Sequence, residues 1–222
     1  MKQFFLVIAM CFGATYLSAQ TDSTKSEFGL VFYNEWCNRV LAVDEDNKDL
    51  KEELDSLETG AYGFSAGFVY GRKLNSSWTI QSGLTWASRG YAIDSISDAG
   101  VFDFSSRVSM LEIPFTVIKE FGESQKARPF LQTGILAGYV LQHRNSWKQV
   151  GGTAEFESTN LEELNRIQWS ALLSAGVEFS VYKNWRITLD ARFRQAFQPL
   201  SNTDWKRYLN AGGIGIIIKK EF

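Results

Sequence analysis

The segment Trp185-Arg-Ile-Thr-Leu-Asp-Ala-Arg-Phe-Arg-Gln-Ala-Phe197 alternates strictly in polarity over most of its length, and this alternation decides how the chain folds. Its odd positions from Trp185 to Phe193 are apolar, and its even positions from Arg186 to Arg194 are polar or charged. A period of two predicts a β-strand with two unlike faces. Another long alternating segment ends the chain at an aromatic residue, Phe222. Such strands are typical of an outer-membrane β-barrel, whose apolar face meets lipid and whose polar face fills the lumen.

The composition fits one barrel-sized domain. A length of 222 residues suits a single all-β domain of the larger kind. The chain has 23 Lys and Arg against 25 Asp and Glu, so its net charge of −2 argues against a nucleic-acid partner. The mean hydropathy of −0.17 excludes a bundle of membrane-spanning helices. It is compatible with a barrel, because half of each barrel strand is polar.

The N-terminus predicts a secretory signal peptide over residues 1–19. Lys2 supplies the positive charge, Phe4 to Phe12 is apolar, and Leu17-Ser18-Ala19 ends in small residues. The apolar run is shorter than the ~20 residues that a membrane-spanning helix needs. We therefore expect residues 20–222 to be an exported barrel domain of a Gram-negative cell envelope. Cleavage leaves Cys37 as the single cysteine of that domain, so we expect no internal disulfide.

Eight segments have the polarity pattern of strands, and their connections alternate in length. The strands are predicted at 27–37, 61–73, 78–90, 106–119, 129–142, 166–182, 185–197 and 207–222. The long connections are 38–60, 91–105, 143–165 and 198–206. Outer-membrane barrels have short periplasmic turns and longer outside loops, and an even strand number places both termini in the periplasm. We predict a monomeric, all-β, eight-stranded antiparallel up-and-down transmembrane barrel.

The inward positions of these strands carry charges of both signs. The candidates are the acids Glu35, Glu112, Glu178 and Asp190 and the bases Arg89, Arg186, Arg192 and Arg194. The interior of an eight-stranded barrel is only wide enough for side chains to fill. Buried charges need partners, because an unpaired one is costly. We therefore predict a lumen filled by an ion-pair network, with a narrow ion path or proton relay as the alternative.

The hairpin between the sixth and seventh strands allows a more specific prediction. Both polar faces must lie on the same side, which requires an odd-numbered loop, most simply Tyr182-Lys183-Asn184, with Val181 opposite Trp185. That register sets Glu178 opposite Thr188 and brings Arg186 within reach of Glu178. We expect those two side chains to pair. Asp190 should then turn to Arg192, Arg194 or a base on the last strand.

Other polar features carry weaker hypotheses. The first long connection is acidic, with Asp44, Glu45, Asp46, Asp49, Glu52, Glu53, Asp55 and Glu58. We expect a solvated surface there, with weak divalent-ion bridging to lipopolysaccharide as the alternative. The lone His143 has Ser146 nearby in sequence, but hydrolysis also needs an arranged nucleophile and base, and no further signature supports one. We therefore predict no catalytic, cofactor-binding or metal-binding residues and no enzyme activity.

Two neighbouring segments carry a resemblance to a known family. Met110-Leu-Glu-Ile-Pro-Phe-Thr-Val-Ile-Lys119 and Ala127-Arg-Pro-Phe-Leu-Gln-Thr-Gly-Ile-Leu-Ala-Gly-Tyr-Val-Leu141 resemble the PorT-like outer-membrane β-barrel family of Bacteroidetes, a porin-family group. The resemblance implies an eight-stranded barrel and no single activity. Some members of that family are linked to protein secretion and gliding.

The sequence therefore predicts a non-enzymatic outer-membrane protein with a structural or interaction role in the cell envelope. The alternatives are a small transport or ligand-binding barrel and a lipid-modifying enzyme that uses His143. The expected partners are outer-membrane lipid, lipopolysaccharide and envelope proteins. Phe222, an outward aromatic at the end of the chain, is expected to be part of the signal that the barrel-assembly machinery recognises.

Overall fold

The computed structural model describes residues 25–42, 57–97, 100–122, 126–149, 155–159, 161, 164–201 and 206–222. The predicted signal peptide and residues 43–56 of the first connection, which include all of its acidic residues except Glu58, lie outside the described residues. No helix in the described part of the chain is long and apolar enough to cross a membrane.

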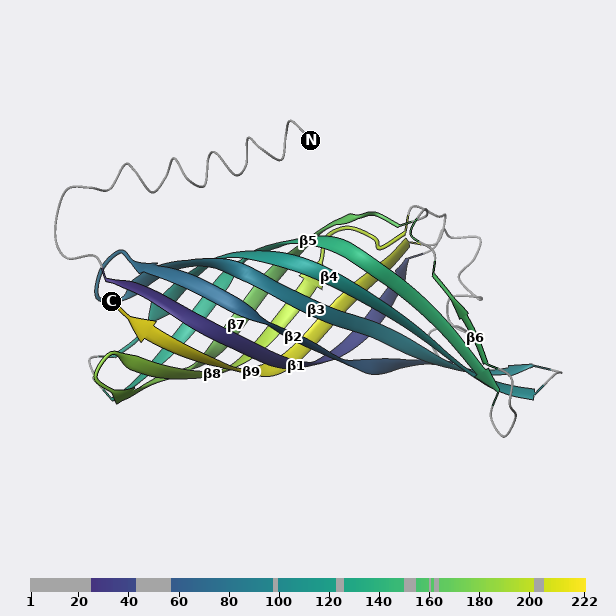
Figure 1. Ribbon diagram of the computed structural model, residues 1–222, viewed down its shortest axis with the longest axis horizontal. Coiled ribbons are helices and arrows are strands. Elements are labelled where there is room, and N and C mark those ends of the chain that lie inside the picture. Colours follow the sequence, from purple (N-terminus) through teal and green to yellow (C-terminus); the bar gives the residue numbers. More distant parts are fainter. Residues whose placement is uncertain are drawn as a thin grey trace, which may run out of the picture.

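Eight antiparallel strands close into a ring, which confirms the predicted fold class (Figure 1). The strands are β1 (Ser26–Ala42), β2 (Glu58–Lys73), β3 (Trp78–Ser97), β4 (Gly100–Glu120), β5 (Ala127–Gln149), β6 (Glu155–Ser158), β7 (Ile167–Tyr182), β8 (Trp185–Ala196) and β9 (Lys206–Glu221). The ring runs β1-β2-β3-β4-β5-β7-β8-β9 and closes through pairing of β9 with β1, while β6 pairs with β5. Glu27 at the start of β1 lies opposite Glu221 at the end of β9. We call this end of the barrel the terminal end and the opposite end the loop end.

The two faces of the strands differ as the alternation predicts. Two sets of exposed aromatic side chains ring the outer surface: Trp36, Tyr62, Trp86 and Tyr139 toward the loop end, and Tyr70, Trp78, Tyr182 and Trp185 toward the terminal end. Tyrosine and tryptophan prefer the two interfaces of a membrane. The two sets are therefore the aromatic girdles of a transmembrane barrel, and the wall between them faces hydrocarbon.

Several strands are longer at the loop end than the sequence predicted. Strands β3 and β4 pair as far as Ser97 and Gly100, so most of the predicted loop 91–105 is strand. Strand β5 continues to Gln149, and β6 lies within the predicted loop 143–165. Neighbouring strands satisfy each other's backbone hydrogen bonds whether or not lipid covers them, so pairing does not stop at the membrane. Figure 1 shows these strands projecting far beyond the rest of the ring.

The β7–β8 hairpin reaches the predicted register by another route. Glu178 lies opposite Thr188 as predicted, but Trp185 pairs with Tyr182 and not with Val181. The register shifts at Val181, so a β-bulge supplies the extra residue that parity requires. A two-residue turn then suffices, with Lys183 at a left-handed φ of 45°.

The orientation of the barrel leads to the first prediction. In a Cys37→Ser background, a cysteine at Gln149 near the end of β5 should react with an impermeant maleimide in whole cells. A cysteine at Asn184, in the turn at the terminal end, should react only after the outer membrane is permeabilised. The measurement is labelling before and after permeabilisation. The opposite pattern would show that the terminal end faces outward.

Candidate functional site

Arg89 is the centre of a buried ion-pair cluster in the middle of the lumen. Its guanidinium reaches from β3 to acids on two other strands: Nε lies 2.7 Å from Glu35 Oε2, and Nη1 lies 2.8 Å from Glu112 Oε1. The side chain of Arg89 is inaccessible to solvent, and both acids are almost as deeply buried. Arg89 therefore links β1 and β4 across the lumen.

Two arginines of β8 complete this central cluster, which we define as Glu35, Arg89, Glu112, Arg192 and Arg194. Arg192 Nε donates to Glu35 Oε1 over 2.9 Å. Arg194 Nη1 lies 3.3 Å from Glu112 Oε1, and its Nε donates to the hydroxyl of Ser170 over 2.9 Å. Three cations thus surround two carboxylates, and the contacts join opposite sides of the barrel.

Asp190 does not have the partner that the sequence predicted. Its carboxylate accepts hydrogen bonds from the Tyr33 hydroxyl, over 3.1 Å, and from the Ser174 hydroxyl. It forms no ion pair with any residue that the structure describes, so the prediction of an arginine or last-strand partner was wrong. The Tyr33 ring occupies the space above Gly215, where a Cβ would lie 2.1 Å from the ring, and this packing holds the hydroxyl near Asp190. The Arg192 side chain stacks on the Tyr33 ring, with its guanidinium carbon 3.4 Å from the ring centroid.

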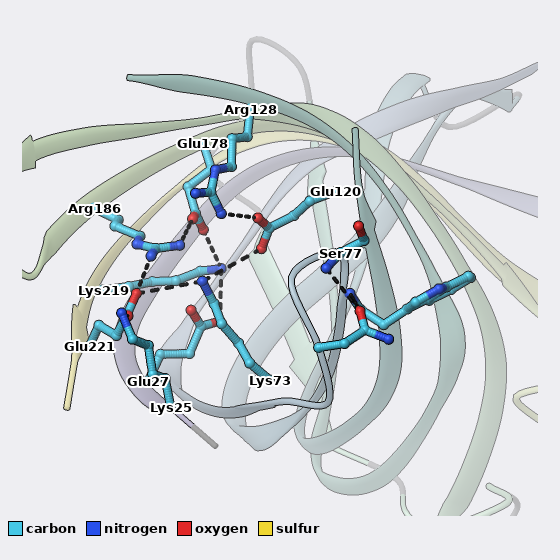
Figure 2. Close-up of polar contacts among 12 residues, drawn as sticks. Lys25, Glu27, Lys73, Ser77, Glu120, Arg128, Glu178, Arg186, Lys219 and Glu221 are labelled. Carbon is cyan, nitrogen blue, oxygen red and sulfur yellow. Dashed lines mark hydrogen bonds and ion pairs between the residues drawn. The ribbon is translucent and has the colours of Figure 1, made fainter. Parts of the chain in front are cut away.

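A second cluster of charges fills the lumen at the terminal end (Figure 2). We call it the terminal cluster; it comprises Lys25, Glu27, Lys73, Glu120, Arg128, Glu178, Arg186, Lys219 and Glu221. Lys219 Nζ lies 3.1 Å from Glu27 Oε1 and 2.9 Å from Glu178 Oε2. Arg186 Nη1 lies 2.6 Å from Glu178 Oε1, the partner that the strand register predicted, and Arg186 also contacts Glu221.

The rest of the terminal cluster connects several strands and Lys25, the residue that precedes β1. Glu221 also pairs with Lys25, over 2.7 Å, and with Lys73, over 3.5 Å. Arg128 Nη1 lies 2.8 Å from Glu120 Oε2. Each of these acids is largely buried, so the contacts are shielded from water. Together with the Lys219–Glu27 pair and the Lys73–Glu120 pair, at 4.0 Å, they cross-link β1, β2, β4, β5 and β9 at one end.

The sequence analysis found only Glu178 and Arg186 of this terminal cluster. The missing members were detectable in part: Ile214, Ile216 and Ile218 face outward, so parity places Lys219 and Glu221 inside. The same parity places Glu27 inside on β1. The contacts of Lys73, Glu120 and Arg128 were not detectable, because they depend on how the strands are staggered around the ring.

Little open space remains between these charges. A cavity of about 10 Å³ lies beside Glu120, Gln132, Glu178, Thr188 and Lys219, which is room for about one water molecule. Toward the loop end, the lumen continues into a buried apolar cluster: Ala87, Val108, Met110, Val140, Leu164 and Leu200. A second apolar cluster, of Val31, Tyr33, Val69 and Ile217, lies between the two ion-pair clusters, and a third, of Cys37, Tyr91, Leu209 and Ala211, lies toward the loop end. The described part of the lumen thus contains two ion-pair clusters and three apolar clusters.

The structure also places the remaining candidates. His143 Nε2 lies 2.9 Å from the hydroxyl of Ser106, a serine on another strand and not the Ser146 that is near it in sequence. Both partners are buried on the lumen face. Glu58, expected in a solvated acidic loop, is the first residue of β2 and lies 2.6 Å from Arg39 Nε. No group of three or more metal-ligating side chains occurs among the described residues.

Comparison with known proteins agrees with this architecture. The family described as outer membrane protein beta-barrel domain matches residues 21–202, and the chain belongs to this family and to the outer membrane. Among solved structures, OprG from Pseudomonas aeruginosa has 8% sequence identity and a TM-score of 0.53, covering 90% of this chain and 96% of OprG. Neisserial surface protein A has 13% identity and a TM-score of 0.47, covering 90% of this chain and 100% of its own. No curated protein matches the sequence.

Proposed function

We propose that this protein is a non-enzymatic, non-conducting anchor that presents a projecting sheet at the cell surface to another macromolecule of the envelope. The observation that carries the proposal is the projecting sheet itself, formed by β3, β4, β5 and the short β6. A barrel that only stabilises the membrane has no need of paired strands far beyond its ring. The PorT-like resemblance supports a protein of a secretion system as the partner.

The projecting sheet carries a row of large apolar side chains on one face. Ile93, Phe104, Trp147 and Phe156 are successive cross-strand neighbours in register. The rings of Phe104 and Trp147 lie 5.0 Å apart, and Phe156 at the end of the row is 63% exposed. Ile93 and Phe104 are half-buried and pack against the buried cluster of Cys37, Tyr91, Leu209 and Ala211, so the exposed part of the row is its outer end at Phe156. An exposed aromatic side chain there is a candidate contact for a partner, because aromatic residues are enriched at interfaces.

The row ends at the edge of the sheet. Strand β6 pairs with β5 on one side and has no strand partner on its other side in the described part of the chain. An unpaired edge presents backbone donors and acceptors that an extended segment of another protein can use. The combination of an edge that no described strand pairs with and an exposed Phe156 fits a protein partner that adds a strand.

Crosslinking tests this proposal. A photoreactive residue at Phe156 should form a specific protein adduct in intact envelopes, because this side chain lies at the exposed end of the row. Tyr182 is equally exposed, at 63%, but lies at the terminal end, and a photoreactive residue there is the matched control. Adducts are identified by mass spectrometry. The same adducts at both positions, or none at Phe156, would contradict the proposed surface.

The filled lumen predicts the absence of a steady channel. The purified barrel in a planar bilayer should show no conductance above background, because side chains occupy the lumen at both ion-pair clusters and at the apolar clusters. The measurement is single-channel recording, with a known porin as the positive control. A stable open state would support the alternative of a small transport barrel and overturn the anchor.

The buried position of Ser106 and His143 supports a non-enzymatic role. The hydroxyl of Ser106 and the imidazole of His143 are buried in the lumen, next to side chains that pack against them, whereas an acyl substrate would approach from the lipid. We interpret this pair as an internal hydrogen bond that satisfies both groups.

Phe222 is 67% exposed at the terminal end, and its N–H donates to the Ser26 carbonyl over 2.8 Å. Its exposed ring supports the proposal that the assembly machinery recognises it.

A further inference from the structure

A groove of about 600 Å³ crosses the outer wall of the barrel over β7, β8, β9 and β1. Its floor contains Ala175 and Ala191, which are direct cross-strand partners. On the terminal side, the next pair is Val177 and Leu189, whose larger side chains border the groove. The small floor residues therefore create a hollow in a wall that is otherwise covered by large apolar side chains.

Asn34 is the polar side chain that borders this groove from β1. It belongs to the same cross-strand row as Ala175, Ala191 and Ile214. Its side chain is exposed on the outer face and forms no hydrogen bond with any described residue. An amide without a partner is costly in hydrocarbon, and polar groups at such positions are commonly functional.

The depth of Asn34 restricts what it can contact. It lies two residues from Trp36 of the loop-end girdle, which on a tilted strand corresponds to a depth of about 5 Å below that girdle. The ester carbonyls of glycerophospholipids lie at the interface itself. The 3-hydroxyacyl chains of lipopolysaccharide carry a hydroxyl two carbons deeper, on the side of the membrane that the loop end is predicted to face.

We propose that this groove binds one acyl chain of lipopolysaccharide, with the Asn34 amide hydrogen-bonded to the 3-hydroxyl group of that chain. Ala175 and Ala191 admit the chain, and Val177 and Leu189 border it on the terminal side. A volume of about 600 Å³ lies within the ordinary range of small-ligand sites, about 300–1,000 Å³. The proposal is independent of the interaction role of β6 and depends on the orientation that cysteine labelling tests.

Native mass spectrometry of the folded barrel in detergent tests the site, with lipid A and phosphatidylethanolamine added separately. The wild type should retain one lipid A and bind phosphatidylethanolamine about tenfold more weakly, the factor expected for one hydrogen bond. Asn34→Leu should lower lipid A binding to the phosphatidylethanolamine level. Ala191→Phe should abolish retention of either lipid, because the new ring fills the groove.

Ala137→Phe is the matched control, since Ala137 also faces outward but lies on β5, away from the groove. It should bind lipid A like the wild type, and heat-modifiable migration on gels verifies folding of each variant. Unchanged lipid A binding in Asn34→Leu, or equal binding of the two lipids by the wild type, would overturn the proposal. A dimer that both groove variants abolish would also overturn it, by assigning the groove to a second copy of the chain.

Discussion

Replacing Arg89 with alanine is expected to lower the free energy of unfolding by about 3–5 kcal/mol, the cost of breaking a buried ion pair by removing one partner. Arg89 is inaccessible to solvent and contacts both Glu35 and Glu112. Its removal leaves four buried charges, those of Glu35, Glu112, Arg192 and Arg194. Glu112 then loses both hydrogen bonds that its carboxylate accepts in the described structure, because Arg194 Nη1 lies 3.3 Å away without forming one. Denaturant titration in lipid vesicles, followed by tryptophan fluorescence, measures the change.

Two further variants separate the ion pair from a general effect of losing an arginine. Arg144→Ala removes an exposed arginine that lies 3.9 Å from Glu157, and surface pairs of this kind contribute ~0–1 kcal/mol. The double variant Arg89→Met, Glu112→Gln removes one buried charge of each sign, keeps the Glu35–Arg192 pair and should recover part of the loss. Equal stability of Arg89→Ala and Arg144→Ala would show that the central cluster does not stabilise the barrel.

Replacing Lys219 with alanine is expected to cost about 3 kcal/mol for a related reason. Lys219 is the only ion-pair partner of Glu27 among the described residues, and it also neutralises Glu178. One oxygen of Glu27 already lacks a hydrogen bond in the described structure, so the acid has no alternative partner in place. The same titration measures the effect.

Arg186→Ala is the informative comparison within the terminal cluster. Its acids keep other partners, because Glu178 retains Lys219 and Glu221 retains Lys25 and Lys73. The expected loss is therefore smaller, about 1–2 kcal/mol. A larger loss for Arg186→Ala than for Lys219→Ala would show that Lys219, Lys25 and Lys73 do not stabilise Glu178 and Glu221 when Arg186 is absent.

The sequence by itself determined the fold class and the assignment of the two faces. Strict alternation, as in Trp185 to Phe193, fixes which side chains face lipid and which face the lumen, because a strand turns successive residues to opposite sides. It also gave the opposition of Glu178 and Thr188, since the polar faces of β7 and β8 must agree. These properties are local or depend on the parity of a hairpin, and parity can be read along one chain.

Only the tertiary structure decided which charges meet. Arg89 contacts Glu35 on β1, and Arg192 reaches the same acid from β8, contacts that depend on strand stagger and barrel closure. Asp190 pairs with hydroxyls because Tyr33 occupies the space over Gly215. The projecting strands and the outer groove also depend on strand ends and on side-chain sizes in neighbouring rows. Alternation specifies a face, whereas partners across a lumen depend on distances that exist only after the ring has closed.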